Sequence, residues 1–330
     1  MDKIDFHTHI LPEEIPNWNE KFGYGGFIYL DDIGKEDQKM MMKDTGQAFR
    51  LVDCNCYSGK ARVKDCDRDE VTMQVLSTVP VMFSYWAKPE DTLEVSMFLN
   101  DHIASVCKEN PERFVGLGTL PMNDVNMAIK ELERCMLELG MKGVEIATNI
   151  NGENLDEEKF FPLYKRMEEL GAVVFVHPWD MMGWKDMQKY WLPWIVSMPA
   201  ETSRAICSLL FGNVFKSFPK LKFVFAHGGG EFIGTLGRIQ HAYNVRPDLY
   251  PNKCSPREYL KNIYVDSLVH DHDMLNKLAK ELGTDHIVLG TDYPFPLGEL
   301  DPGKLVETSE LDEKDKEKIL WKNAHGLLNL

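Results

Sequence analysis

The sequence has few basic residues for its size and no long apolar run. Lysine and arginine number 37 against 52 aspartates and glutamates in 330 residues, a formal net charge of −15. Because nucleic acids and anionic membranes bind clustered Lys and Arg, this balance argues against both as partners. No stretch of eighteen apolar residues occurs, so we expect no membrane-spanning helix. The charged residues 1–6 do not have the pattern of a signal peptide.

Cysteine is also scarce, and its seven residues are scattered along the chain. An odd, scattered set predicts reduced thiols in a cytoplasmic protein and argues against a disulfide framework. Cys54 and Cys56 form a C-x-C pair without a second pair, so we interpret them as free thiols. The three glycines at 228–230 lack the lysine of a phosphate-binding loop and indicate a tight turn.

Eight short apolar runs are predicted to be β-strands. Most are apolar on both faces, which is typical of parallel strands covered by helices. Helical patterns at 92–109, 123–139 and 156–170 lie between some of them. The eight runs are residues 3–9, 74–79, 114–120, 143–148, 173–177, 222–227, 263–268 and 287–292. This alternation predicts an α/β fold, a (β/α)8 or TIM barrel, in a single domain spanning residues 1–330.

Such a barrel needs roughly 250 residues, so part of this chain is extra. Residues 11–67 separate the first two predicted strands, and residues 179–217 follow the fifth. Both segments follow the carboxyl end of a strand, which is the face where barrel active sites lie. We therefore expect a distorted barrel with insertions after strands 1 and 5, and the insertion at 11–67 near the active-site mouth.

Five residues with metal-binding side chains lie at the ends of predicted strands. His7 and His9 are two apart on the first strand, so their side chains would share one face, together with that of residue 5. His177, His227 and Asp292 end the fifth, sixth and eighth strands. A lone His-x-His pair would more often have no ligand role, but five ionisable residues converging at one barrel mouth are costly to bury unpaired. They predict a metal site, and imidazoles with one carboxylate favour Zn²⁺.

This arrangement of histidines and aspartate resembles the amidohydrolase superfamily. Longer segments are similar to the 2-amino-3-carboxymuconate-6-semialdehyde decarboxylase family, and the resemblance extends from His7 to the C-terminal region. These segments are LSTVPVMFSYWAKPED at 76–91, HPWD at 177–180, KYWLPW at 189–194, AHGGG at 226–230 and LGTDYPFPLGE at 289–299.

The resemblance implies a zinc-dependent, non-oxidative decarboxylase without an organic cofactor. Its reaction would convert 2-amino-3-carboxymuconate 6-semialdehyde to 2-aminomuconate 6-semialdehyde in the kynurenine pathway of tryptophan catabolism. That step limits the formation of quinolinate and NAD. The matching positions imply that His7, His9, His177 and Asp292 hold one zinc ion, and that His227 handles the proton of the zinc-bound water.

The resemblance also implies the residues that bind substrate. Arg50, in AFRL at 48–51, matches an arginine that binds a substrate carboxylate. Arg238, in LGRI at 236–239, matches an arginine that reaches the neighbouring active site in a homodimer. Trp194 and Phe295 match aromatic residues that line the pocket.

Several alternatives stay open at this point. Without the resemblance, Arg50 could not be chosen over Arg62 or Arg68, nor Arg238 over Arg246. The same five site residues would also suit a metal-dependent hydrolase of an amide, lactone or ester. A third possibility is a barrel without catalysis that serves as a dimerising or binding module.

Two positions depart from the family pattern. The family has a pocket lysine near the position of Arg50, but Lys43 is offset by one residue, so that lysine is unassigned. The fourth predicted strand carries Glu145, and in other amidohydrolases this strand can supply a group that bridges two metals. One metal per subunit is nevertheless the prediction.

Overall fold

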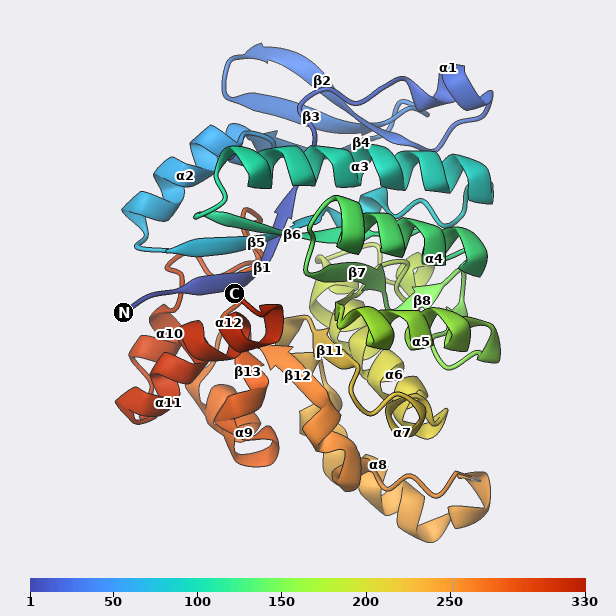
Figure 1. Ribbon diagram of the computed structural model, residues 1–330, viewed down its shortest axis with the longest axis vertical. Helices are drawn as coiled ribbons and strands as arrows, with labels where there is room; N and C mark the ends of the chain where they lie inside the picture. Colours follow the sequence, from blue (N-terminus) through green and yellow to red (C-terminus); the bar gives the residue numbers. More distant parts are fainter. Residues whose placement is uncertain (251) are drawn as a thin grey trace.

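The computed structural model describes residues 1–250 and 252–330, and its centre is a barrel of eight strands surrounded by helices (Figure 1). Every neighbouring pair of these strands is parallel. In sheet order, the strands are β1 (Ile4–Ile10), β5 (Met73–Thr78), β6 (Phe114–Thr119), β7 (Gly143–Ala147), β10 (Val173–His177), β11 (Lys222–Phe225), β12 (Ile263–Asp266) and β13 (Ile287–Val288). The predicted barrel and its eight strands are confirmed.

The chain after β13 closes the barrel against β1. The strand itself is only two residues long, shorter than the predicted run. Beyond it, the N–H of Phe6 donates to the carbonyl of Leu289, and the N–H of His9 donates to that of Tyr293, both at 2.8 Å. Thr8 and Tyr293 form a parallel bridge. The residues that follow the last strand therefore lie beside the histidines of the first.

The helices cover the outside of the barrel, as expected for buried parallel strands. They are α2 (Gly59–Arg68), α3 (Pro89–Glu109), α4 (Val125–Glu133), α5 (Phe161–Leu170), α6 (Met198–Phe211), α7 (Val214–Ser217), α8 (Phe232–Val245), α9 (His272–Leu282), α10 (Lys304–Glu307), α11 (Glu313–Glu317) and α12 (Asn323–Leu328). Within the described residues, none of them is long and apolar enough to cross a membrane.

The amino-terminal end of the barrel is filled by apolar side chains. Ile4, Val173 and Val288 of the strands pack with Leu327 and Leu328 of α12, and all five are buried. In Figure 1, α12 lies across the barrel strands near the C-terminus. Since this end is closed, substrate access is left to the opposite end, where the strands finish.

The segment between β1 and β5 forms a small sheet of its own. Helix α1 (Trp18–Phe22) precedes three antiparallel strands, β2 (Ile28–Lys35), β3 (Gln38–Lys43) and β4 (Ala48–Asp53). The sequence analysis expected a wall here without predicting strands. Met41 and Val52 of the sheet are buried against the loops at the carboxyl ends of the barrel strands. The last part of the predicted range 11–67 is α2, which is a barrel helix.

The segment after β10 approaches the same end of the barrel. It contains two short helical turns, Trp184–Asp186 and Pro193–Ser197, before α6 begins. Tyr190 and Trp191 have φ of 60° and 59°, in the left-handed region that non-glycine residues seldom adopt. This tight turn leads directly into Trp194, which reaches the pocket described below.

Candidate active site

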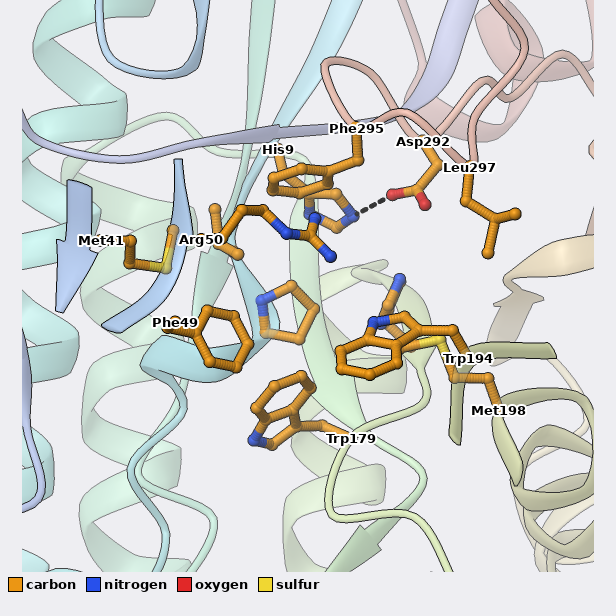
Figure 2. A pocket seen from close by; sticks show the side chains of 13 residues that line it. His9, Met41, Phe49, Arg50, Trp179, Trp194, Met198, Asp292, Phe295 and Leu297 are labelled. Carbon is orange, nitrogen blue, oxygen red and sulfur yellow. Dashed lines mark ion pairs between the residues drawn. The ribbon is translucent and has the colours of Figure 1, made fainter. Parts of the chain in front are cut away.

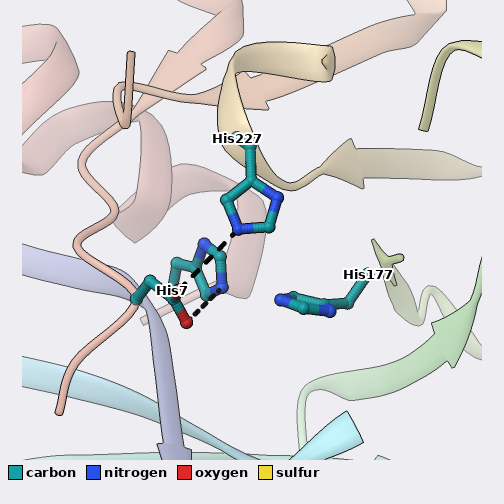
Figure 3. Close-up of side chains that lie close together, drawn as sticks. His7, His177 and His227 are labelled. Carbon is teal, nitrogen blue, oxygen red and sulfur yellow. Dashed lines mark ion pairs between the residues drawn. The ribbon is translucent and has the colours of Figure 1, made fainter. Parts of the chain in front are cut away.

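Three imidazole rings, of His7, His177 and His227, meet the Asp292 carboxylate at the carboxyl end of the barrel (Figure 3), and the His9 ring adjoins them. Neighbouring ring centroids lie 4.9–5.1 Å apart. One oxygen of Asp292 is 3.4 Å from Nε2 of His7 and 3.2 Å from Nε2 of His9. The other is 3.8 Å from Nε2 of His227. With His177, these are the five residues that the sequence analysis placed at one mouth, and the structure brings them together.

The cluster fits a metal ion. Donor atoms from His7, His177, His227 and Asp292 all lie within 4.8 Å of one another. Nε2 of His9 is 3.1 Å from Nε2 of His7, so it adjoins the same point. Nε2 of His177 is buried without a hydrogen-bond partner among the described residues, which is costly unless a cation is bound. Imidazole nitrogens with one carboxylate suit zinc or a similar transition metal.

Three of the imidazoles are held by oxygen acceptors at Nδ1. Such contacts select the tautomer in which Nδ1 carries the proton, and they leave Nε2 free for a metal. The acceptors are the Asp266 carboxylate for His7 at 2.7 Å, the Thr78 carbonyl for His9 at 2.8 Å and the Pro178 carbonyl for His177 at 3.1 Å.

The Asp5 carboxylate hydrogen-bonds neither histidine ring among the described contacts. A bulge between Asp5 and Thr8 interrupts the alternation of β1. The Asp5 carboxylate instead accepts the backbone N–H of His7 at 3.3 Å and the hydroxyl of Thr291 at 2.6 Å. Asp266, which the sequence analysis did not single out, contacts the His7 ring. Its only sequence signal is an acidic residue directly after the apolar β12 run.

Charge in the cluster is concentrated on Asp292 and His227. Burial alone would raise the pKa of Asp292, but contacts with His227 and His9 hold it well below its usual range. Burial alone would lower the pKa of His227, but Asp292 raises it. Burial and the neighbouring imidazoles lower the pKa of His177. Asp292 is thus a persistent negative charge, and His227 is an imidazole whose pKa this carboxylate raises.

Glu145 lies behind the cluster on β7. One carboxylate oxygen is 3.6 Å from Nδ1 of His9, and within the described residues neither oxygen has a hydrogen-bond partner. Burial raises the pKa of Glu145 well above its usual range, and nearby Asp292 adds to this. Glu145 is not part of the group whose donors lie within 4.8 Å. Glu145 therefore lies outside the set of donors that could share one metal ion.

A pocket opens directly above the cluster (Figure 2). The open space of this pocket, counted to its mouth, is about 490 Å³. Beyond the cluster residues, the lining comes from both inserted segments, from the loop after β5 and from the chain after β13. These residues are Met41, Phe49, Arg50, Val79, Pro80, Trp179, Trp194, Met198, Phe295 and Leu297. Trp194 and Phe295 were singled out from the sequence, whereas Phe49 and Trp179 were missed.

Arg50 is the only cationic side chain among these lining residues. Its guanidinium carbon lies 4.5 Å from the centre of the Phe295 ring, a stacking contact that holds it in the pocket. It forms no ion pair with any described residue. Burial lowers the pKa of Arg50, partly offset by Asp292. Figure 2 shows the guanidinium directed toward the space between His9 and Asp292.

The structure separates Arg50 from the other candidate arginines. Arg62 is buried behind the site and donates to the carbonyl of His9 at 2.6 Å. Arg68 is on the surface and pairs with Asp65 at 2.7 Å. Neither arginine lines the pocket, and each is already engaged in a contact elsewhere.

Arg238 and Arg246 both lie at α8 and outside the pocket of their own chain. Arg246 pairs with Asp248 at 2.7 Å. Arg238 is exposed and has no ion pair with any described residue. Lys43 does not line the pocket either, so the pocket lysine of the family has no counterpart among the described lining residues.

Comparison with known proteins agrees with this fold. The amidohydrolase family model matches residues 4–330. Barrel and cluster therefore define a member of the amidohydrolase superfamily. The chain is 54% identical to the 2-amino-3-carboxymuconate-6-semialdehyde decarboxylase of Dictyostelium discoideum, over 99% of this chain and 92% of that protein. It is 44% identical to the Caenorhabditis elegans protein of the same name, over 99% and 94%.

The chain belongs to the 2-amino-3-carboxymuconate-6-semialdehyde decarboxylase family, and it is a carboxy-lyase. The predicted family and reaction class are confirmed, and neither the hydrolase nor the non-catalytic alternative is supported. Solved structures under 25% identical share the fold. One is the Metarhizium anisopliae IDCase, with a TM-score of 0.82 at 18% identity, covering 99% of this chain and 97% of that one. Another is a dihydroxybenzoic acid decarboxylase from Polaromonas sp. JS666 with bound manganese, at 0.81 and 21%, covering 100% and 97%.

Proposed function

We propose that this protein decarboxylates 2-amino-3-carboxymuconate 6-semialdehyde to 2-aminomuconate 6-semialdehyde, without oxidation and with bound zinc. The observation that carries the proposal is the unpaired guanidinium of Arg50, facing the histidine and aspartate cluster in a chain 54% identical to a decarboxylase of that name. The substrate is a dianion, and a desolvated guanidinium is the group best suited to bind a carboxylate.

One zinc ion per subunit would be held by His7, His9, His177 and Asp292, without an organic cofactor. When bound, zinc supplies a Lewis acid and lowers the pKa of a coordinated water to about 7. The free Nε2 of His177 and the Nε2 atoms of His7 and His9 beside Asp292 support this ligand set. The same donor types also bind manganese, so zinc is the part of the proposal that needs direct measurement.

His227 would be the catalytic acid and base. Loss of CO₂ from an unsaturated carbon leaves an electron pair in a vinyl orbital, so that carbon must first become tetrahedral. His227 would take a proton at Nε2 from the water that adds to the substrate double bond. Protonated His227 would return this proton to the carbon that bears the carboxylate, where it takes the place of the CO₂ to be lost. When the carbon–carbon bond to CO₂ breaks, its electrons would re-form the double bond and expel the added hydroxide, which leaves as water after taking a proton from solvent. Such proton transfer is typically worth about 10²–10⁴ in rate.

Arg50, Trp194 and Phe295 would position the substrate. Arg50 would accept one carboxylate in a two-point contact, with the Phe295 ring behind it. Trp194 would cover the conjugated chain from the other side of the pocket. The pocket is mostly apolar and has a single cationic side chain. Such a pocket would bind a flat acid and hold it in one orientation above the cluster.

Arg238 would bind the second carboxylate from a neighbouring subunit, which requires a homodimer. Its exposure and lack of an ion pair support this role, whereas Arg246 is already neutralised by Asp248. A second opening beside His227, lined by Ile195, Pro199, Leu268, Val269 and Met274 among others, offers a path into the site.

The proposed reaction places the enzyme at a branch of the cytoplasmic kynurenine pathway. Its substrate also cyclises spontaneously to quinolinate, a precursor of NAD. Decarboxylation would therefore compete with NAD formation for the same compound.

The test joins metal content and activity in one preparation. We would count zinc and manganese per subunit, add freshly generated substrate, and follow its absorbance decay and CO₂ release against the uncatalysed rate. One zinc per subunit with fast, CO₂-releasing decay supports the proposal. A chelated sample reloaded with zinc or manganese gives the matched comparison. Stoichiometric metal without accelerated decay would refute the substrate assignment.

A further inference from the structure

Asp266 is a buried carboxylate that touches two parts of the cluster at once. One oxygen accepts the Nδ1–H of His7 at 2.7 Å and the backbone N–H of His227 at 2.9 Å. The other accepts the backbone N–H groups of Gly228 at 2.8 Å and Leu268 at 3.1 Å. The residue is fully buried, so these four donors replace its entire hydration.

The turn that Asp266 holds is an unusual one. His227 and Gly228 have φ of 56° and 61°, both in the left-handed region. Non-glycine residues seldom adopt this conformation, and those that do cluster at functional sites. The two consecutive N–H groups of this turn both point at the Asp266 carboxylate. The direction in which the His227 ring leaves the backbone therefore depends on Asp266.

Gly290 shows how closely the pair is packed. A Cβ atom at this position would lie 2.6 Å from Cβ of Asp266 and 2.8 Å from Cβ of His7. Real Cβ atoms do not approach other atoms so closely, so any larger residue would push Asp266 and His7 apart. The glycine thus permits the contact of 2.7 Å between the carboxylate and the ring.

We infer that Asp266 is a positioning residue that couples the metal site to proton transfer, by fixing the His7 ring through Nδ1 and the His227 ring through its backbone. This inference rests on the metal-dependent function proposed above. Removing the carboxylate charge would leave Nδ1 of His7 free to lose its proton to Nε2, which blocks the atom facing the metal. It would also release the turn that carries His227.

The experiment compares Asp266→Asn with Asp271→Asn. The control makes the same change five residues later, at an exposed carboxylate that caps α9. Zinc affinity is measured by competition with a chromophoric chelator, and kcat and KM are measured at saturating zinc. For D266N we expect zinc affinity to fall about 10–100-fold, in line with other partners of metal-binding histidines. We also expect a lower kcat at saturating zinc with little change in KM, because His227 is displaced while the substrate pocket is intact.

Each outcome is decisive. Zinc affinity and zinc-saturated kcat both matching D271N would overturn the inference, and so would a change in only one of them. If D266N is not recovered folded, Gly290→Ala keeps the carboxylate and displaces it, and the same two losses are expected. Failure of both variants to fold while D271N folds would make Asp266 a folding residue and overturn the positioning role. Failure of the unaltered protein to bind zinc or decarboxylate would instead refute the proposed function.

Discussion

Replacing Arg50 with methionine tests the assignment of the pocket most directly. Methionine keeps the length and apolar stem of the side chain and removes the charge. A two-point contact between guanidinium and carboxylate comprises two charge-assisted hydrogen bonds, each worth about 1.5–3 kcal/mol. Allowing for water that replaces part of the contact, we expect a loss of about 3–4 kcal/mol, which is roughly 10²–10³-fold in kcat/KM.

The lysine variant separates charge from shape. Arg50→Lys keeps a positive charge but loses the planar fork that matches a carboxylate and stacks on Phe295. Its kcat/KM should therefore lie between those of the native protein and R50M. The matched control is Arg68→Met, at a surface arginine paired with Asp65, and this change should alter kcat/KM by less than about twofold.

The assay measures kcat/KM from the decay of substrate absorbance, with zinc content measured on the same samples. Arg50 is not a proposed ligand, so R50M should retain the native zinc content. The reasoning is refuted if R50M, with full zinc, keeps kcat/KM within about fivefold of the native value, less than the loss of one charged hydrogen bond. A loss of zinc from R50M would equally contradict the separation of pocket and metal site.

Three further predictions address the metal, the dimer and acid stability. Removing the metal with a chelator should abolish activity and lower Tm, because a ligand at 100 times its Kd stabilises by about 2.7 kcal/mol; an unchanged Tm after verified removal would contradict a metal site in the barrel. Mixing R50M with Arg238→Ala, each inactive alone, should restore about a quarter of native activity, because half of the dimers formed by random subunit exchange carry one intact site of two. If subunits exchange and no activity returns, Arg238 does not complete the neighbouring subunit's site. Burial lowers the pKa of His102 to about 4, so its stabilising contribution is present above pH 6.5 and is lost as the pH falls toward 4. Between pH 6.5 and 4, the free energy of urea unfolding of the metal-free native chain should fall by up to about 3 kcal/mol more than that of metal-free His102→Leu. Equal falls in the two chains would contradict this prediction.

The convergence of the four histidines and Asp292 was predictable because it combines strong local signals with one rule of topology. His177, His227 and Asp292 each end a predicted strand, His7 and His9 lie on the first, and parallel strands in a barrel finish at the same end. Once eight such runs are recognised, the convergence of their last residues follows. No further information is needed to bring together these residues, which are far apart in the sequence.

Other parts of the site have no comparable signal. Asp266 is one acidic residue among 52, and nothing in its sequence neighbourhood distinguishes a ring partner from a helix cap. The bulge at Asp5 was equally hidden, because it depends on pairing with the neighbouring strand and not on residue type. The inserted sheet was missed because its strands are half exposed and mix charged with apolar residues, without clean alternation.

These differences divide the site into two parts with different origins. The metal cluster comes from the barrel strands and from the chain that closes the barrel, and the barrel is shared with structures under 25% identical. Arg50 comes from β4 of the inserted sheet, and Trp194 comes from the segment after β10. Under the proposed function, the cluster would supply the metal chemistry, and the inserted segments would select the acid. Substitutions in them should change which acid is accepted before they change whether the metal is bound, whereas changes at Asp266 should do the opposite.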